Sequence, residues 1–154
     1  MDRLSESMES ATVEQYLHDH IPLSRSMAVS VVQVNQKGVV LSAPLPPNIN
    51  HRSTAFGGSL SAVAILAAWT YVHCQLQNLS LPCRIVIQGN SIEYLQPVET
   101  DFQAHCMAPS QLLWDRFIKT ITRRGKGRIS LNVEIVSDAL LAGTFQGQYV
   151  ALKL

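Results

Sequence analysis

The chain has 154 residues, of which 47% are hydrophobic and 15% are charged, with a formal net charge of +1. This length fits one domain with a sizeable core. The near-neutral charge removes the electrostatic case for a nucleic-acid-binding protein, and the small charged fraction suggests that a second copy of the chain covers part of the surface.

The N-terminal residues 1–11 are polar and acidic, which predicts a flexible tail, no signal peptide and a cytoplasmic protein. The remaining residues, 12–154, are expected to form a single domain. The three cysteines, Cys74, Cys83 and Cys106, are an odd number without the spacing of metal ligands. We therefore expect reduced, buried thiols and no metal site.

The first third of the chain alternates between turn-forming residues and β-branched runs. Thr12 has the character of a helix N-cap, with Gln15 at the capping-box position, and Pro22 is expected to end that helix. The predicted elements are a helix over 12–20, a strand over 26–34, a turn over 35–38 and a strand over 39–45.

A long apolar helix is predicted to begin at Gly57 or Gly58 and to end near Leu79. Its most apolar run, Ala62–Trp69, is shorter than the roughly 18 residues that a membrane-spanning helix needs. We therefore expect a buried core helix.

The second half of the sequence reads mainly as strands. Gly89 and Asn90 indicate a bulge in the first of them, and Gly125 is a natural C-cap for a helix that precedes it. The predicted elements are strands over 84–95, 101–108, 128–136 and 143–154 and a helix over 110–124. The pattern predicts an α+β protein in which one antiparallel sheet curls around one apolar helix.

Three separated stretches carry a resemblance to a known family: "NINHRSTAFGGS" from Asn48, "IEYLQPV" from Ile92 and "GKGRISL" from Gly125. The chain resembles the hotdog-fold thioesterases, and more closely a putative thioesterase family that also forms the C-terminal domain of the YiiD acetyltransferase-like fusion. The resemblance implies a homodimer or a dimer of dimers with acyl-thioester sites between subunits. It implies no cofactor, because the substrate carries phosphopantetheine from acyl carrier protein or coenzyme A. Close members of the group are implicated in decarboxylating malonyl-acyl carrier protein.

The residues before the apolar helix have the chemistry to bind a thioester. Unpaired N–H groups of Gly57 and Gly58 at an electropositive helix start suit a developing oxyanion. The Asn50 amide is a candidate second donor, Thr54 a candidate cap or substrate ligand, and Phe56 an apolar wall. Each also has a plain structural reading: a tight glycine turn, an amide bonded to its own loop, or an ordinary cap.

His51 is a candidate acid or base, whereas His73, well inside the apolar helix, is expected to be structural. Between Asp19 and Glu93 the sequence has no carboxylate, and Phe56 stands where some relatives have histidine. Hydrolysis would depend on His51, on water held by Asn50, or on a partner subunit's carboxylate such as Glu93. Loss of CO2 from a malonyl thioester needs neither base nor nucleophile, and we therefore favour it over hydrolysis. A non-catalytic acyl-thioester-binding module is the remaining alternative.

Five cations lie within ten residues: Lys119, Arg123, Arg124, Lys126 and Arg128. We expect Arg123, Lys126 and Arg128 to bind the phosphates of coenzyme A or the acidic helices of a carrier protein. The alternative is a solvated helix end whose cations favour the helix dipole.

Overall fold

The structure, a computed structural model, describes residues 9–154. These residues form four α-helices, one short 3-10 helix and six strands. In chain order the elements are α1 (Ser10–His20), α2 (Pro22–Ser26), β1 (Ser30–Asn35), β2 (Gly38–Ala43), η1 (Pro46–Asn48), α3 (Gly57–Asn78), β3 (Cys83–Tyr94), β4 (Phe102–Met107), α4 (Gln111–Arg124), β5 (Lys126–Ser137) and β6 (Leu140–Lys153).

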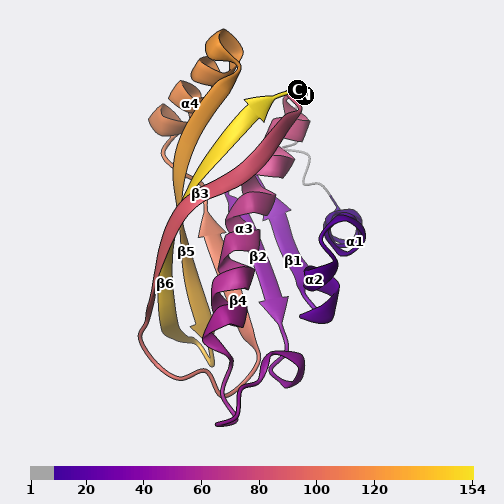
Figure 1. Ribbon diagram of the computed structural model, residues 1–154, viewed down its shortest axis with the longest axis vertical. Coiled ribbons are helices and arrows are strands. Elements are labelled where there is room, and N and C mark those ends of the chain that lie inside the picture. The colour runs from indigo at the N-terminus through magenta and orange to yellow at the C-terminus, as the bar shows by residue number, and fades with distance from the viewer. Residues whose placement is uncertain (1–8) are drawn as a thin grey trace.

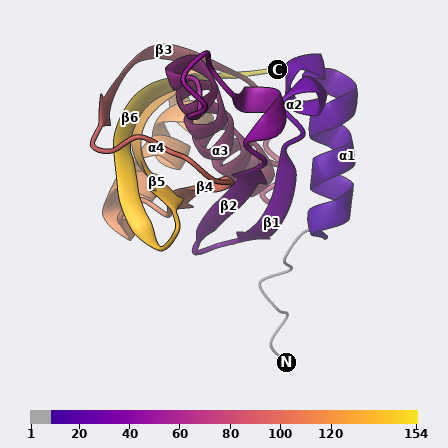
Figure 2. The same cartoon turned by 90° about the horizontal axis from the view of Figure 1, so that it is seen from below.

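The six strands form one antiparallel sheet in the order β1-β2-β4-β5-β6-β3. The sheet curls around α3, while α1 and α2 lie beside β1 and α4 lies near the far end of α3 (Figures 1 and 2). This α+β arrangement is the hotdog fold, which confirms the fold expected from the sequence. The two outermost strands are β1 and β3.

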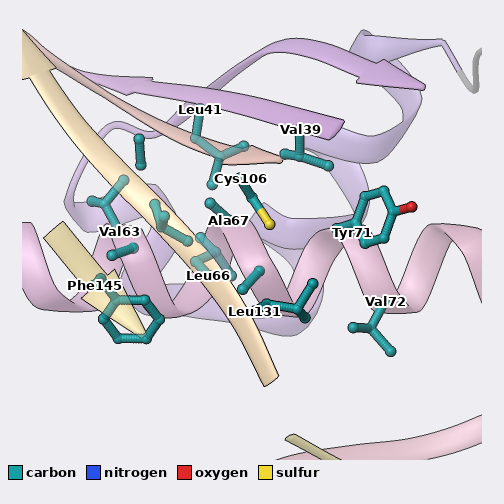
Figure 3. Close-up of a cluster of buried hydrophobic side chains, with 14 of the residues drawn as sticks. Val39, Leu41, Val63, Leu66, Ala67, Tyr71, Val72, Cys106, Leu131 and Phe145 are labelled. Atoms are coloured by element: carbon teal, nitrogen blue, oxygen red, sulfur yellow. The ribbon is translucent and has the colours of Figure 1, made fainter. Parts of the chain in front are cut away.

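Helix α3 is apolar around most of its circumference, so it needs cover on several sides. Figure 3 shows side chains of α3 and of the surrounding strands meeting in one cluster, with Val63, Ala67 and Val72 fully buried. Small alanine side chains let the strands approach the helix closely. Although α3 is long and apolar enough by composition to cross a membrane, 67% of its most apolar window is buried inside the fold. It is therefore a core helix, as expected.

The N-terminal part of the chain differs from the sequence prediction. Helix α1 begins at Ser10 with Glu9 as its N-cap, so Thr12 is not the cap but lies in the first turn, where its N–H bonds the Glu9 carbonyl oxygen at 3.0 Å. Of the predicted tail, residues 1–8 lie outside the described part of the chain. Ser10 and Ala11 belong to the helix, which begins directly after Glu9 without a side-chain cap.

A second helix was missed after α1. Pro22 was expected only to end the first helix, but it also occupies the first turn of α2, where its fixed φ favours a helix start. The five residues of α2 delay β1, which begins at Ser30 and not at Ser26. A helix of this length is too short to show a 3.6-residue period.

Two local predictions in the second half are confirmed. The pairing of β3 with β6 shifts register between Ile87 and Gly89, which is the expected bulge. Helix α4 begins after Ser110, whose hydroxyl oxygen accepts the Leu113 N–H, and ends at Gly125 with φ 75°. Glycine suits that left-handed position because it has no Cβ.

The three thiols are unpaired, but their burial differs. Cys74 and Cys106 are fully buried, and desolvation raises the pKa of each to about 12. Cys83, at the start of β3, is partly exposed, so the expectation of a buried thiol is wrong there because β3 is an edge strand. Its pKa is also raised, mainly by desolvation, while Lys153 opposes the shift.

One buried hydroxyl fastens α3 to the sheet. The Tyr149 hydroxyl, on β6, donates to the Ile65 carbonyl oxygen of α3 at 2.7 Å. The side chain is fully buried, and burial raises its pKa, so the hydroxyl keeps its proton. The bond fixes the position of the helix along the strands.

Aromatic rings attach α1 to α3. His73 is stacked between Tyr16 of α1 and Trp69 of α3, with ring centroids 4.7 Å from each, and His20 lies 4.2 Å from Tyr16. Desolvation, and secondly the charge of His20, lowers the pKa of His73 below 6.5. The stack confirms the structural role expected for His73.

Replacing Tyr149 by phenylalanine should lower the free energy of unfolding by about 1 kcal/mol, because one buried hydrogen bond is lost. Urea unfolding followed by circular dichroism measures the change. The matched control is Tyr16→Phe, since no hydrogen bond to the Tyr16 hydroxyl is found among residues 9–154. Equal stability of the two variants would contradict the role of the Tyr149 bond.

The His73 stack should also make stability depend on pH. Because the pKa of His73 is lower in the folded chain than the unfolded value of 6.5, the unfolded chain takes up the proton first. The contribution of neutral His73 to the free energy of unfolding is complete above pH 6.5. It is lost as the pH falls towards the pKa of His73 in the folded chain. The drop in unfolding free energy between about pH 7.5 and 5.5 should be smaller in His73→Phe, which keeps a stacking ring. Equal drops in the variant and the original chain would exclude this linkage.

Candidate functional site

Two backbone amides are free at the start of α3. Phe56 is the N-cap, and no side chain caps the helix. The N–H groups of Ser59 and Leu60 both bond the Phe56 carbonyl oxygen, at 2.9 and 3.2 Å. Within the described chain, the N–H groups of Gly57 and Gly58 have no hydrogen-bond partner. They are therefore available to a ligand at the electropositive end of a 22-residue helix.

Both glycines have close side-chain neighbours. A Cβ at Gly57 would lie 3.3 Å from the Tyr94 hydroxyl oxygen, and a Cβ at Gly58 would collide with the Phe56 ring. The Tyr94 hydroxyl donates to the Gly57 carbonyl oxygen at 3.0 Å. Phe56 is 58% exposed, so its ring forms an apolar surface beside the helix start.

The loop before α3 is organised by Asn50. Its Oδ1 accepts the N–H groups of Arg52 at 2.8 Å and Thr54 at 3.2 Å, and its Nδ2 donates to the Thr54 hydroxyl oxygen at 2.8 Å. A further bond, Ala55 N–H to the Val98 carbonyl oxygen at 2.8 Å, holds the loop against the segment after β3. Asn50 therefore shapes the loop and fixes the orientation of the Thr54 hydroxyl.

A cleft of about 410 Å³ opens beside Gly57. Its walls are mostly apolar, and neither a carboxylate nor an imidazole lines it. Thr54 contributes a hydroxyl whose oxygen already accepts a bond from Asn50, so its proton can be donated into the cleft. The lining residues are Thr54, Ala55, Gly57, Leu60, Tyr94, Leu95, Gln96, Pro97 and Val98.

The structure brings most of the predicted site residues together. Thr54 and Gly57 line the cleft, Gly58 and Phe56 flank it at the helix start, and Asn50 reaches it through Thr54. His51 is exposed at the loop tip and is not among the lining residues. The geometry therefore gives no support to His51 as an acid or base within this subunit.

Glu93 is turned away from the site. It lies opposite Thr144 of β6, and it shares the outer face of the sheet with Ser91 and Glu134. The next residue, Tyr94, points to Gly57 on the inner face. Within one subunit, Glu93 therefore does not reach the cleft at Gly57.

A second, cationic cleft of about 710 Å³ lies between α4 and the first half of β5. Arg116 and Arg124 come from α4, and Lys126 and Arg128 come from β5. The expected Arg123 is not among the residues that line this cleft. Leu113, Phe117 and Ile129 form an apolar floor, and no carboxylate lines this cleft.

The cationic cleft lies well away from Gly57 within one subunit. Gly127, which lines the cationic cleft, pairs with Ala151 of β6, and Ala151 in turn pairs with Ile85 of β3. The Ile85 carbonyl oxygen accepts the Trp69 indole N–H at 3.1 Å. Because Trp69 follows Gly57 by twelve residues, the two sites are separated by about 18 Å along α3.

Sequence reasoning missed two residues that shape the site. Tyr94 ends a strand and its contact with Gly57 spans 37 positions, so no local pattern signals it. Asn48 is buried, and its amide donates to the carbonyl oxygens of Met27 at 2.9 Å and Pro44 at 2.8 Å. A buried amide directly before the loop was visible in the sequence only as one more polar residue.

Comparison with known proteins gives a consistent result. Residues 10–153 match the family described as Putative thioesterase (yiiD_Cterm). A protein of unknown function from Chlorobaculum tepidum TLS is 34% identical, with a TM-score of 0.92 over 97% of this chain and 99% of the other. A putative thioesterase from Shewanella oneidensis is 30% identical, with a TM-score of 0.83 over 93% and 96%. The E. coli PaaI protein from the phenylacetic acid degradation operon is 14% identical, with a TM-score of 0.67 over 96% of each chain, and shares the fold.

Replacing Asn50 by alanine should loosen the loop, because three side-chain bonds are lost. We expect the free energy of unfolding to fall by about 1–3 kcal/mol and the amides of Ala55 and Phe56 to exchange hydrogen faster. Urea unfolding and hydrogen exchange measure both effects. Ser53→Ala is the matched control in the same loop and should change neither. Unchanged exchange in Asn50→Ala would show that the loop is held without it.

Proposed function

The chain belongs to the family of putative thioesterases (yiiD_Cterm), and on that premise we propose that it acts on acyl thioesters at the start of α3. The reaction that we propose is decarboxylation of malonyl-acyl carrier protein to the acetyl thioester, a step that can initiate fatty-acid synthesis. One observation carries the proposal: two unpartnered amides lie beside a largely apolar cleft that neither a carboxylate nor an imidazole lines.

Decarboxylation matches the groups that are available. The bond between the malonyl α-carbon and its carboxylate carbon breaks, and CO2 leaves. The electron pair moves into the thioester, which becomes an enolate with negative charge on oxygen. The N–H groups of Gly57 and Gly58 stabilise that charge as it develops, and a mostly apolar cleft strengthens the effect. The α-carbon then takes one proton, which water supplies.

The cleft also avoids features that would oppose this reaction. A carboxylate in the lining would repel the malonyl carboxylate, and a cation there would stabilise the charge that must be lost. Thr54 can donate a hydrogen bond to the substrate or hold the water that delivers the proton, because its hydroxyl proton is uncommitted. Asn50 orients that hydroxyl through its amide.

Hydrolysis of the acyl thioester is the second candidate, and the description of the family favours it. Water attack needs a base or a strongly positioned water. Thr54 and Asn50 could position water, but the nearest imidazole in the loop, His51, is exposed at its tip. The missing base is the physical reason to place decarboxylation first.

The proposed substrate also accounts for the cationic cleft. The carrier protein is acidic and coenzyme A bears phosphates, so either would be attracted to Arg116, Arg124, Lys126 and Arg128. The thioester arrives with its own phosphopantetheine arm, and the protein supplies no cofactor.

We further propose a cytoplasmic homodimer, or a dimer of dimers, as the working assembly.

Incubation with malonyl-acyl carrier protein, followed by mass spectrometry of the intact carrier, separates the candidates. We expect the carrier to lose the mass of CO2 and to retain an acetyl group. Release of the whole acyl group, leaving the free pantetheine thiol, would overturn decarboxylation in favour of hydrolysis. Malonyl-coenzyme A in a parallel reaction shows which carrier is used. No product from either substrate would leave a binding module and reject the enzymatic proposal.

The same assay tests the loop. Asn50→Ala should lower turnover by at least about a hundredfold, the order expected when a donor at an oxyanion site is lost or misplaced. Ser53→Ala should retain the original rate. Full activity of Asn50→Ala would remove this residue from the mechanism.

A further inference from the structure

The first half of β5 has a neighbouring strand on one side only. Strand β6 pairs with β5 from end to end, but β4 pairs with it only from Val133 onward. The chain leaves the sheet after Met107, where β4 ends, and continues into α4. Residues 126–132 of β5 therefore present an open edge on the side where β4 would otherwise continue. The N–H and C=O groups of such an edge are ready to bind another strand.

The backbone groups of this part of β5 alternate in direction. In an antiparallel pair, directly opposite residues alternate between pairs that exchange both backbone hydrogen bonds and pairs that exchange none. The Lys153 N–H donates to the Gly125 carbonyl oxygen at 2.8 Å, so every second residue counted from Gly125 faces β6. The residues between them, Lys126, Arg128 and Ser130, turn their N–H and C=O groups to the open edge. These groups have no hydrogen-bond partner among residues 9–154.

The cationic cleft lies along this open edge. Its lining includes Ile129, which is buried on the inner face of the sheet, and Lys126 and Arg128, which are exposed on the outer face. A cleft that reaches both faces of one strand must pass around the edge of that strand. Helix α4 forms the opposite wall. An exposed sheet edge beside a groove is a place where an extended peptide can add as an extra strand.

The two faces of the cleft select different side chains. A strand paired with β5 would alternate its side chains between the two faces of the sheet. Those on the inner face would meet the apolar floor, which includes Leu113 and Phe117, and those on the outer face would lie beside Lys126 and Arg128. Opposite charges that face each other on paired strands stabilise the pairing. No carboxylate lines the cleft, so the segment that fits it alternates acidic and apolar residues.

The same geometry disfavours other occupants. A second copy of the chain, paired through the same edge, would set the cations of the two copies against each other. The chain's own residues 1–8 contain Asp2 and Glu6, but Leu4 and Met8 are spaced from them by even numbers of residues, so acidic and apolar side chains would share one face. A helix of a carrier protein can meet the cations, but its backbone groups are already bonded within the helix.

We propose that the cleft between α4 and β5 binds an extended acidic segment of another protein, which adds to the sheet antiparallel to β5 along Lys126–Ser130. The added strand continues the line of β4 and gives partners to the open N–H and C=O groups of β5. This interaction does not rest on the acyl-thioester activity. Under the proposed function, a bound segment would compete with the carrier for the cations of the cleft.

A fluorescent peptide of alternating glutamate and valine residues tests the proposal by fluorescence anisotropy. Its glutamates would lie opposite Lys126, Arg128 and Ser130, so their N–H groups would point to β5 and those of the valines away from it. N-methylation of the glutamates should raise the Kd at least about tenfold, since several hydrogen bonds are lost. N-methylation of the valines keeps the charge and the hydrogen bonds and should change the Kd only a few-fold.

Equal affinities of the two methylated peptides would overturn strand addition, because charge alone would then hold the peptide. Failure of the unmodified peptide to bind would also overturn it, and binding of malonyl-acyl carrier protein in that case would assign the cleft to a helix.

Charge reversal and hydrogen exchange locate the bound peptide. Arg128→Glu should raise the Kd about tenfold or more, whereas Lys119→Glu, an exposed position of α4 outside the cleft, should leave it unchanged. In the original chain, the peptide should slow hydrogen exchange at the Arg128 and Ser130 amides; unchanged exchange there would overturn the proposal even if Arg128→Glu failed to fold. None of these measurements depends on turnover, so failure of the peptide site is distinguishable from failure of the acyl-thioester activity.

Discussion

The fold depends on the burial of α3. A helix that is apolar around most of its circumference cannot lie on a flat sheet with one side exposed, so the strands must curve around it. Long strands β5 and β6 provide this curvature, and Tyr149 fixes the helix against them. The same burial leaves the first turn of α3 at the end of the sheet. There the first N–H groups of the helix have no side-chain cap and remain available to a ligand.

Under the proposed function, the two clefts divide the recognition of a long substrate between them. The cleft at Gly57 has apolar walls and no carboxylate, which suits a reacting centre where charge develops. The cleft at α4 has four cations over an apolar floor, which suits the anionic end or carrier. Because about 18 Å along α3 separates them, small substrates would engage one cleft at a time. The proposed substrate, a thioester on an extended arm, has groups suited to both kinds of cleft.

Features with a local signal could be predicted from the sequence. The apolar run of α3, the alternation in β4 and β5, the bulge at Gly89 and the cap at Gly125 all depend on neighbouring residues. The rest depends on distant contacts or on helix rotation. Tyr94 reaches Gly57 only after the sheet has formed, and the choice of Arg124 over Arg123 depends on how α4 sits on β5. For the loop, the residue types were correct, but the internal bonds of Asn50 changed its expected role towards positioning.

The bulge in β3, where one extra residue is inserted between Ile87 and Gly89, also restricts how this segment can evolve. Between Arg84 and Glu93, substitutions at outward positions change only the surface that the strand presents. An insertion or a deletion there would rotate one half of the strand relative to the other, and would turn Tyr94 away from Gly57 while bringing Glu93 inward. The length of this segment is therefore under a stronger constraint than its composition, and homologous chains should vary here in residue identity while conserving the number of residues.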